Sequence, residues 1–267
     1  MVLHCALNKF VVLARQQCFV LPCRSLLVIK FSLLCQIVVF LFTPLVLANE
    51  PASQQPSDEL LEIFTQRPES IYGAKATYRV YRNKKPVGSH TLRFSHQTNE
   101  LTVEVESRLA VKVLGITLYR YRYSAVEVWS GGELVNISTE IRNNKKPKVD
   151  IVASSQGSYW RIDARGKSQS TSSPEYGTNH WHPGAIQAKR LYHPLHGKVY
   201  RSAPQSFGWE RVVKEDGVAI SARKFRYSHG FDADVWYDKD WRWVRLEFRA
   251  DDGSRIVYNC DVCTAGE

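Results

Sequence analysis

The stretch from Leu101 to Trp129 alternates apolar and polar residues more regularly than any other part of the chain. This period of two is typical of β-strands with one buried face and one wet face. At roughly 3.3 Å per residue, the segment from Leu101 to Leu114 would extend about 46 Å if straight, whereas an ordinary strand spans about 17 to 20 Å. We therefore predict two long antiparallel strands in a strongly curled sheet.

The remainder of the chain supplies more strands of the same kind. Its 267 residues are 44% hydrophobic and 23% charged, which suits one sizeable core. Short turn signals, such as 83–88, 130–133 and 143–147, favour sequential antiparallel neighbours. Asp58 opens a short helical pattern before the first strand. The predicted fold is mainly β: a curled antiparallel sheet (half-barrel) meander with one short N-terminal helix.

The first 48 residues have the composition of an export signal. Basic residues precede an apolar run from Phe31 to Leu47, acidic residues are absent, and Val46-Leu47-Ala48 provides small residues at a cleavage site. We predict a signal peptide over 1–48 and a periplasmic or secreted protein. The alternative is an uncleaved membrane anchor, because the apolar run is about 17 residues long.

The domain organisation follows from these patterns. We predict a polar linker and short helix over 49–74, the curled β domain over 75–259 and a C-terminal tail over 260–267. Within the domain, 165–197 interrupts the strand pattern with glycine, proline and four histidines. We expect a long loop near the open side of the sheet, with one helical turn near Ala185.

Charge and cysteine content limit the partners. Removing 1–48 takes four basic residues from 36 and leaves 32 against 26 acidic ones, a net charge of +6. Such a chain suits anionic headgroups, lipopolysaccharide or cell wall, and we expect no nucleic-acid partner. Only Cys260 and Cys263 remain after cleavage. Because this pair closes the chain instead of opening a helix, a tail disulfide or two idle thiols is favoured over redox catalysis.

Several short motifs occur in a fixed order between Ala76 and Tyr258. They are Glu127-Val128-Trp129, Gly132-Glu133-Leu134, Trp181 ahead of Gly197-Lys198-Val199, Ala222-Arg223-Lys224-Phe225, and Asp234 to Asp238 followed by Trp243 to Phe248. This pattern resembles a proteobacterial family of exported proteins known only as a domain of unknown function. The resemblance implies an architecture similar to the lipoprotein carriers and receptors of the Lol pathway, whose curled half-barrel holds acyl chains against a helix. The histidine-rich segment and the cysteine pair lie outside the pattern.

The predicted ligand site lies on the concave face of the central strand pair. A three-residue loop over 115–117 would place Tyr119, Tyr121 and Tyr123 opposite Val113, Val111 and Leu109. The same register brings Glu127, opposite Val105, and Trp129 to this face. A buried Glu127 would need an arginine or a tyrosine hydroxyl as partner, whereas a bulge near Ser124 would turn it outward. The aromatic residues suit an amphipathic ligand, and core packing is the alternative.

The histidines give a second candidate site. His180, His182, His193 and His196 form H-x-H and H-x-x-H, which can chelate zinc, although Pro183 and Pro194 interrupt regular geometry. We expect no metal, no cofactor and no catalytic residue. The predicted function is non-catalytic binding of a lipid-like or amphipathic envelope ligand. The alternatives are a metal-dependent hydrolase using the His180 to His196 segment and a structural envelope protein without a ligand.

Overall fold

The computed structural model describes residues 55–113, 116–144, 146–228 and 230–264. Contacts divide the chain into two compact units, Met1–Ala48 and Asn49–Glu267, and the described residues all belong to the second. The predicted signal peptide over 1–48 therefore lies outside the described residues. Among these residues, no helix is long and apolar enough to cross a membrane.

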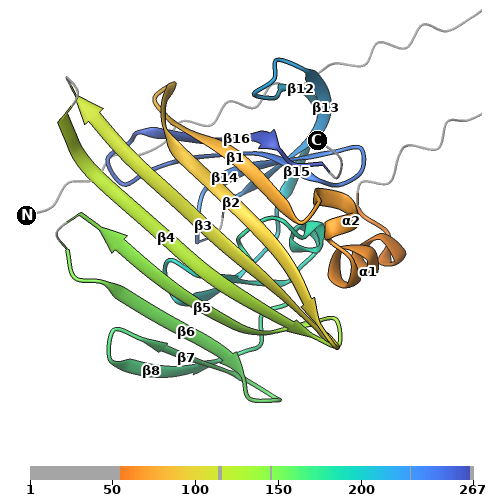
Figure 1. The fold of residues 1–267 in the computed structure, drawn as a ribbon. Helices are drawn as coiled ribbons and strands as arrows, with labels where there is room; N and C mark the ends of the chain where they lie inside the picture. Colours follow the sequence, from red (N-terminus) through yellow and green to blue (C-terminus); the bar gives the residue numbers. More distant parts are fainter. Residues whose placement is uncertain (1–54, 114–115, 145, 229, 265–267) are drawn as a thin grey trace, which may run out of the picture. The chain divides into compact units, whose positions relative to one another are not determined.

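One large antiparallel sheet dominates the domain, which confirms the predicted fold class (Figure 1). It has 13 strands in the order β12-β13-β14-β15-β16-β1-β2-β3-β4-β5-β6-β7-β8 and is not closed by a pair between β12 and β8. The strands are β1 (Lys75–Arg82), β2 (Lys85–Gln97), β3 (Glu100–Val113), β4 (Ile116–Ser130), β5 (Glu133–Asn143), β6 (Val149–Ser155), β7 (Trp160–Ala164), β8 (Lys167–Thr171), β12 (Gln205–Val213), β13 (Ala219–Tyr227), β14 (Ala233–Asp238), β15 (Trp243–Arg249) and β16 (Arg255–Val262).

The sheet has two distinct ends. Because successive strands run antiparallel, the turns β1–β2, β3–β4, β5–β6, β7–β8 and β15–β16 all lie at one end, which we call the mouth. The other end, which we call the base, holds the helices α1 (Asp58–Gln66) and α2 (Glu69–Tyr72) ahead of β1 (Figure 1). The predicted single helix is thus two short helices, separated at Pro68.

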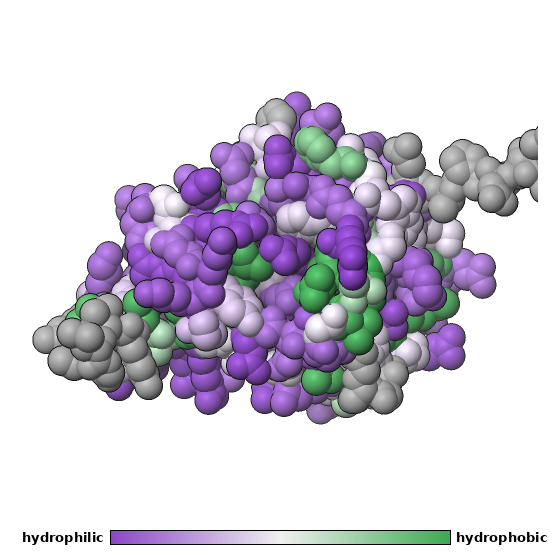
Figure 2. Space-filling model, turned by 90° about the horizontal axis from the view of Figure 1, so that it is seen from above, coloured by the Kyte–Doolittle hydropathy of each residue, from purple (hydrophilic) through white to green (hydrophobic). Residues whose placement is uncertain are grey.

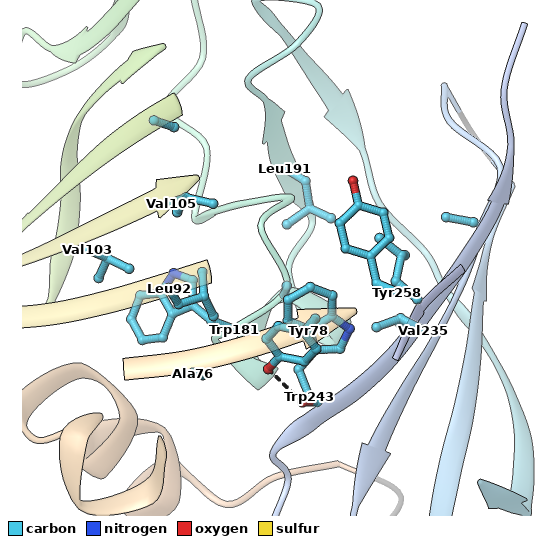
Figure 3. Packing of buried hydrophobic residues seen from close by; sticks show 14 of the residues in the cluster. Ala76, Tyr78, Leu92, Val103, Val105, Trp181, Leu191, Val235, Trp243 and Tyr258 are labelled. Atoms are coloured by element: carbon cyan, nitrogen blue, oxygen red, sulfur yellow. Dashed lines mark hydrogen bonds between the residues drawn. The ribbon is translucent and has the colours of Figure 1, made fainter. Parts of the chain in front are cut away.

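A segment that we call the plug, residues 172–204, fills the concave side of the sheet. It contains β9 (Tyr176–Gly177), the 3₁₀ helix η1 (Pro183–Ile186), β10 (Arg190–His193) and β11 (Lys198–Arg201), whose strands form a small second sheet. Every residue from 179 to 186 is buried. Figure 3 shows Trp181 and Leu191 of the plug among side chains of the large sheet.

The plug corrects the expectation of a loop near the open side. The structure places this segment against the concave face of the large sheet, and it contains three short strands and a 3₁₀ helix of its own. Trp181, Ala185 and Leu191 are each 1% exposed or less, so the segment carries too much apolar surface to remain in water. Its lack of a period of two reflects packing against strands on several sides.

The register of β3 and β4 also differs from the prediction. Tyr119 pairs with Val111, Tyr121 with Leu109 and Glu127 with Val103, two residues away from the predicted partners on β3. One reason is that the connection between the strands is shorter than predicted, since β3 ends at residue 113 and β4 begins at residue 116. The other is an irregularity in the pairing between Val111 and Lys112. A shift of two keeps every side chain on its predicted face. At the chain end, β16 continues to residue 262, through the boundary predicted at 259.

Candidate functional site

Glu127 lies at the centre of a buried polar group. Its side chain is directed to the concave face of β4 and the residue is 1% exposed. Trp129 and Trp181 donate their indole N–H groups to Oε2 over 3.1 and 2.8 Å, and Asn179 donates Nδ2 to Oε1 over 2.5 Å. Burial raises the pKa of the carboxyl group, while these three hydrogen bonds act in the opposite direction.

The hydrogen bonds of this group join β4 to the plug. Tyr123 lies four residues before Glu127 on the same face of β4, and its hydroxyl donates to Oδ1 of Asn179 over 2.9 Å. Gly177 of the plug lies so close that an added Cβ would be 3.1 Å from Glu127 Oε1. The carboxylate is therefore enclosed by protein groups and has no room for a ligand beside it.

The partners of Glu127 differ from those predicted. Neither an arginine nor a tyrosine hydroxyl binds it; two indoles and an amide do. The bulge near Ser124 that would have turned Glu127 outward is not seen, because the pairing of β3 with β4 is regular there. Asn179 and Trp181 were missed as site residues. No period-two pattern could have found them, because residues 178–179 form a turn and His180 has a φ of 62° between the two side chains.

The two histidines of the H-x-H motif occupy separate environments. The His182 ring accepts a hydrogen bond at Nδ1 from the Gly184 N–H over 3.1 Å and pairs through Nε2 with Thr65 Oγ1 at 3.0 Å. The His180 ring instead lies 5.6 Å from Tyr227 between ring centres. Within the described ranges, no group of three or more His, Cys, Asp or Glu side chains could hold a metal ion.

Four histidines, three of them buried and one partly buried, share one electrostatic property. Burial lowers the pKa of each ring to about 3, so the neutral form is the stable one inside the protein. His90, which the sequence did not single out, pairs through Nδ1 with Ser107 Oγ at 2.7 Å and packs edge-on against Trp243. The four are His90, His180, His182 and His193.

Apolar side chains remain partly exposed at the mouth. They continue the concave faces of β3, β4, β5, β6 and β15 beyond the plug and pack against the core without being covered by it. We call the partly exposed apolar side chains of the mouth the collar; it consists of Leu109, Tyr121, Ile141, Val149 and Phe248. On the face seen from above Figure 1, hydrophobic residues likewise lie exposed among hydrophilic ones (Figure 2).

The five predicted ligand residues thus fall into two groups. Tyr123, Glu127 and Trp129 are buried against the plug, at 4%, 1% and 2% exposure. Tyr119 and Tyr121 lie half-buried at the mouth. Burial raises the pKa of both hydroxyls, so they stay protonated as hydrogen-bond donors. The structure brings the first three into one hydrogen-bonded group and leaves the other two beside the collar.

Two surface pockets lie elsewhere. One, of about 360 Å³, is at the base and is lined by Leu60, Trp241 and Arg242 among others. The other, of about 410 Å³, is on the convex face and includes Lys224 and Asp234. Each contains paired charged groups: Arg242 with Asp240 at 3.0 Å in the first, and Lys224 with Asp234 at 3.0 Å in the second. Neither pocket contains any of the predicted ligand residues.

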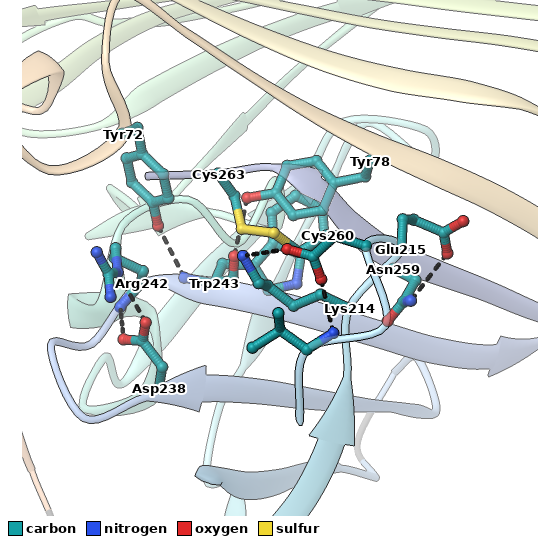
Figure 4. Close-up of a disulfide and its surroundings, with 12 residues drawn as sticks. Tyr72, Tyr78, Lys214, Glu215, Asp238, Arg242, Trp243, Asn259, Cys260 and Cys263 are labelled. Carbon is teal, nitrogen blue, oxygen red and sulfur yellow. Dashed lines mark hydrogen bonds and ion pairs between the residues drawn. A yellow bond between two sulfur atoms is a disulfide. The ribbon is translucent and has the colours of Figure 1, made fainter. Parts of the chain in front are cut away.

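The two cysteines of the predicted disulfide are joined. Cys260 lies on β16 and Cys263 just beyond it, and their sulfur atoms are bonded with a Cα–Cα distance of 5.8 Å (Figure 4). Both residues are buried, with Tyr72, Tyr78 and Trp243 nearby in the same view. The bond fastens the end of the chain to the base.

Comparisons with known proteins give a family and a fold. Residues 78–261 match the family described as Domain of unknown function (DUF6134). No curated protein matches the chain. A solved structure, a β-barrel-like protein of domain of unknown function DUF1849 from Brucella abortus, is similar with a TM-score of 0.53 and 7% identity, over 71% of this chain and 96% of that one. At this identity the likeness concerns the fold alone.

Proposed function

The chain belongs to the DUF6134 family of domains of unknown function, and we propose that it is an exported, non-catalytic protein that binds a lipid-like, amphipathic ligand at the mouth of its curled sheet. The observation that carries this proposal is the collar. Its five side chains leave apolar surface in contact with water at the one end that the helices do not cover. Such surface gains free energy when an acyl chain covers it, at roughly 25 cal/mol per Å².

The location at the mouth follows from how the rest of the concave side is filled. Around Glu127 the plug takes the place that a ligand would need. At the mouth, Tyr119 and Tyr121 offer hydroxyl groups beside aliphatic side chains. This combination suits a ligand with an apolar body and a polar head.

A binding role fits the groups better than catalysis does. Glu127 is the most deeply buried acid, and both its oxygens accept hydrogen bonds from protein donors. An acid held in this way is not within reach of a substrate proton, which general acid–base catalysis requires. The similarity to Lol-pathway carriers and receptors inferred from the sequence motifs supports a lipid-like ligand, as an analogy of architecture.

Export is part of the proposal and has its own test. The acid-free segment 1–48 with Val46-Leu47-Ala48 predicts cleavage after residue 48. N-terminal sequencing of protein isolated from its native host should begin at Asn49, in a periplasmic or secreted fraction. An intact N-terminus on protein in the membrane fraction would replace secretion with anchoring.

Ligand binding is tested with a fluorescent fatty acid. The wild type should take up the probe, and Tyr121→Ala should weaken uptake about tenfold because it removes a large part of the collar. The matched control is Tyr159→Ala, which changes a tyrosine that is 43% exposed near the base. Equal uptake by Tyr121→Ala and the control would place binding elsewhere than at the collar.

A structural envelope protein without a ligand is the second candidate. The filling of the concave side by the plug favours it, because a core packed with its own side chains is complete without a guest. Native mass spectrometry of protein purified from its own envelope separates the two candidates. A co-purified lipid supports binding, and a bare chain together with no probe uptake by the wild type supports the structural role.

A further inference from the structure

The distribution of charge between the two ends of the sheet points to a membrane partner. We propose that the mouth docks on an anionic lipid bilayer through a row of exposed basic residues along four of its hairpins, the basic rim. This inference extends the proposed function by naming the membrane from which the ligand would enter. Only the entry of the ligand rests on the proposed function; docking does not. Its own evidence is the placement of charge.

The basic rim comes from four neighbouring hairpins. Three contribute at or next to their turns, which lie at the mouth because the strands alternate in direction. The β3–β4 hairpin contributes Arg120, four residues after the start of β4, where its backbone pairs with Asn144 just after the end of β5. Every member is exposed. The rim consists of Lys84, Lys85, Arg120, Lys146, Arg165 and Lys167.

The hairpins that carry the rim have no acidic residue within their turns. No Asp or Glu occurs in 83–99, 107–126, 141–149 or 164–174. Acids do lie close to the mouth. On the rim hairpins, Asp150 pairs with Lys148 and Asp163 pairs with Arg161. The β13–β14 and β15–β16 turns add Asp232, Asp251 and Asp252, and the last of these forms an ion pair with Arg82. The base has the opposite character. Its acids include Asp58, Glu59, Glu62 and Glu69 of the helices, Glu100 at the start of β3 and Glu133 at the start of β5.

An apolar anchor accompanies the rim. Leu118 on β4 is 60% exposed, and Arg120 follows on the same strand. A leucine that is exposed to water beside basic residues at a strand end can enter the interfacial region of a bilayer while the cations meet the headgroups. Burying the Leu118 side chain among lipid acyl groups also removes apolar surface from water, which is favourable.

The occupant is a bilayer because of the size and shape of the charge pattern. The rim spreads over four hairpins around the collar, so a single small anion would meet only part of it. Each basic residue close to an anionic leaflet strengthens binding about fivefold, and the effect decays within a Debye length of about 8 Å. Only a surface that approaches the whole mouth can use several of these residues together.

The test is sedimentation with vesicles, using protein expressed from the full chain. Vesicles contain 30% phosphatidylglycerol in phosphatidylcholine, and vesicles of phosphatidylcholine alone report binding that does not depend on charge. The mouth variant is Lys85→Glu, Lys146→Glu and Lys167→Glu together. The matched base variant is Arg67→Glu, Lys75→Glu and Lys239→Glu, which changes the net charge equally at exposed sites of the other end.

The wild type should bind the anionic vesicles, and 0.5 M salt should release it. The mouth variant should lose about a hundredfold or more in partitioning, since three contributions of about fivefold are removed. The base variant should stay within a few fold of the wild type. Leu118→Ser should weaken binding without changing its dependence on salt. Circular dichroism melts verify that each variant is folded.

Two results would overturn docking through the mouth: an equal loss in the mouth and base variants, or no preference of the wild type for anionic vesicles. Failure of the proposed ligand function looks different. In that case the wild type binds anionic vesicles but takes up no fluorescent fatty acid. Conversely, uptake that is lost in Tyr121→Ala, together with no vesicle binding, retains the ligand function and rejects docking.

Discussion

Trp181 donates its indole N–H to the Glu127 carboxylate over 2.8 Å, although 54 residues separate the two in sequence. This hydrogen bond joins the plug to the middle of β4. Together with the bonds from Trp129 and Asn179, it satisfies a carboxyl group that would be costly to bury alone. The same three donors would be left without an acceptor if Glu127 were removed.

We therefore expect Glu127→Ala to lower the free energy of unfolding by about 3 to 5 kcal/mol, because it leaves three buried donors unpaired and opens a cavity. Glu127→Gln retains the shape and one acceptor oxygen and should cost about 1 to 3 kcal/mol. Urea unfolding followed by tryptophan fluorescence measures both. Glu104→Ala, on the exposed face of β3, is the control and should change little. A cost for Glu127→Ala no larger than the control would show that the plug does not depend on this group.

The hydroxyl of Tyr72 should be as important for closing the base. It donates to the Trp181 carbonyl over 2.7 Å and accepts from the Trp243 N–H over 2.9 Å, so one atom links α2, the plug and β15. Tyr72→Phe keeps the ring but leaves both backbone groups unpaired, and we expect a loss of about 1 to 3 kcal/mol in thermal or urea unfolding. Tyr159→Phe, with an exposed ring, should be neutral. Equal melting of the two variants would contradict this role.

The buried histidines predict a loss of stability in acid. Their ordinary pKa is 6.5 and burial lowers it to about 3, so between these values the unfolded state binds more protons than the folded state. Stability should then decrease as the pH falls from about 6.5 towards 3. Glu127, whose pKa is raised, acts in the opposite direction and offsets part of this.

The contribution of one histidine can be isolated with His90→Asn, which can keep the contact to Ser107. Removing one proton of uptake should flatten the slope of unfolding free energy against pH by up to about 1.4 kcal/mol per pH unit. Gln97→Asn, which changes an exposed side chain without a titratable group, should leave the slope unchanged. Parallel curves for His90→Asn and the wild type would show that His90 does not stay neutral in the fold.

The Cys260–Cys263 bond should add a modest amount of stability. The bond closes a loop of only three residues' separation, for which chain entropy gives about 2 kcal/mol. Replacing both cysteines by serine should lower the free energy of unfolding by about that amount, and thiol titration of the oxidised, unfolded protein should find neither cysteine free. Two reactive thiols in protein from an oxidising compartment would favour the idle-thiol alternative.

The period-two alternation was enough to predict the antiparallel sheet and the face of most strand residues. The alternation from Leu101 to Trp129 is a property of the backbone pleat, and it survives a register shift of two. For Glu127 it left two alternatives, the concave face or an outward turn at a bulge, and the regular pairing at Ser124 decided for the concave face. The short turns likewise predicted antiparallel neighbours, because a parallel pair of strands needs a much longer crossover connection.

What fills the concave side became known only from the folded molecule. Asn179 and Trp181 bind Glu127 across 52 and 54 residues, and no local pattern encodes contacts of that separation. The same holds for the histidines, whose neutral state depends on burial by strands from both halves of the sheet. The basic rim, too, could not be predicted from local sequence. Lys85 and Lys167 lie far apart in the chain, and they share the mouth because every second turn of an antiparallel meander lies at the same end.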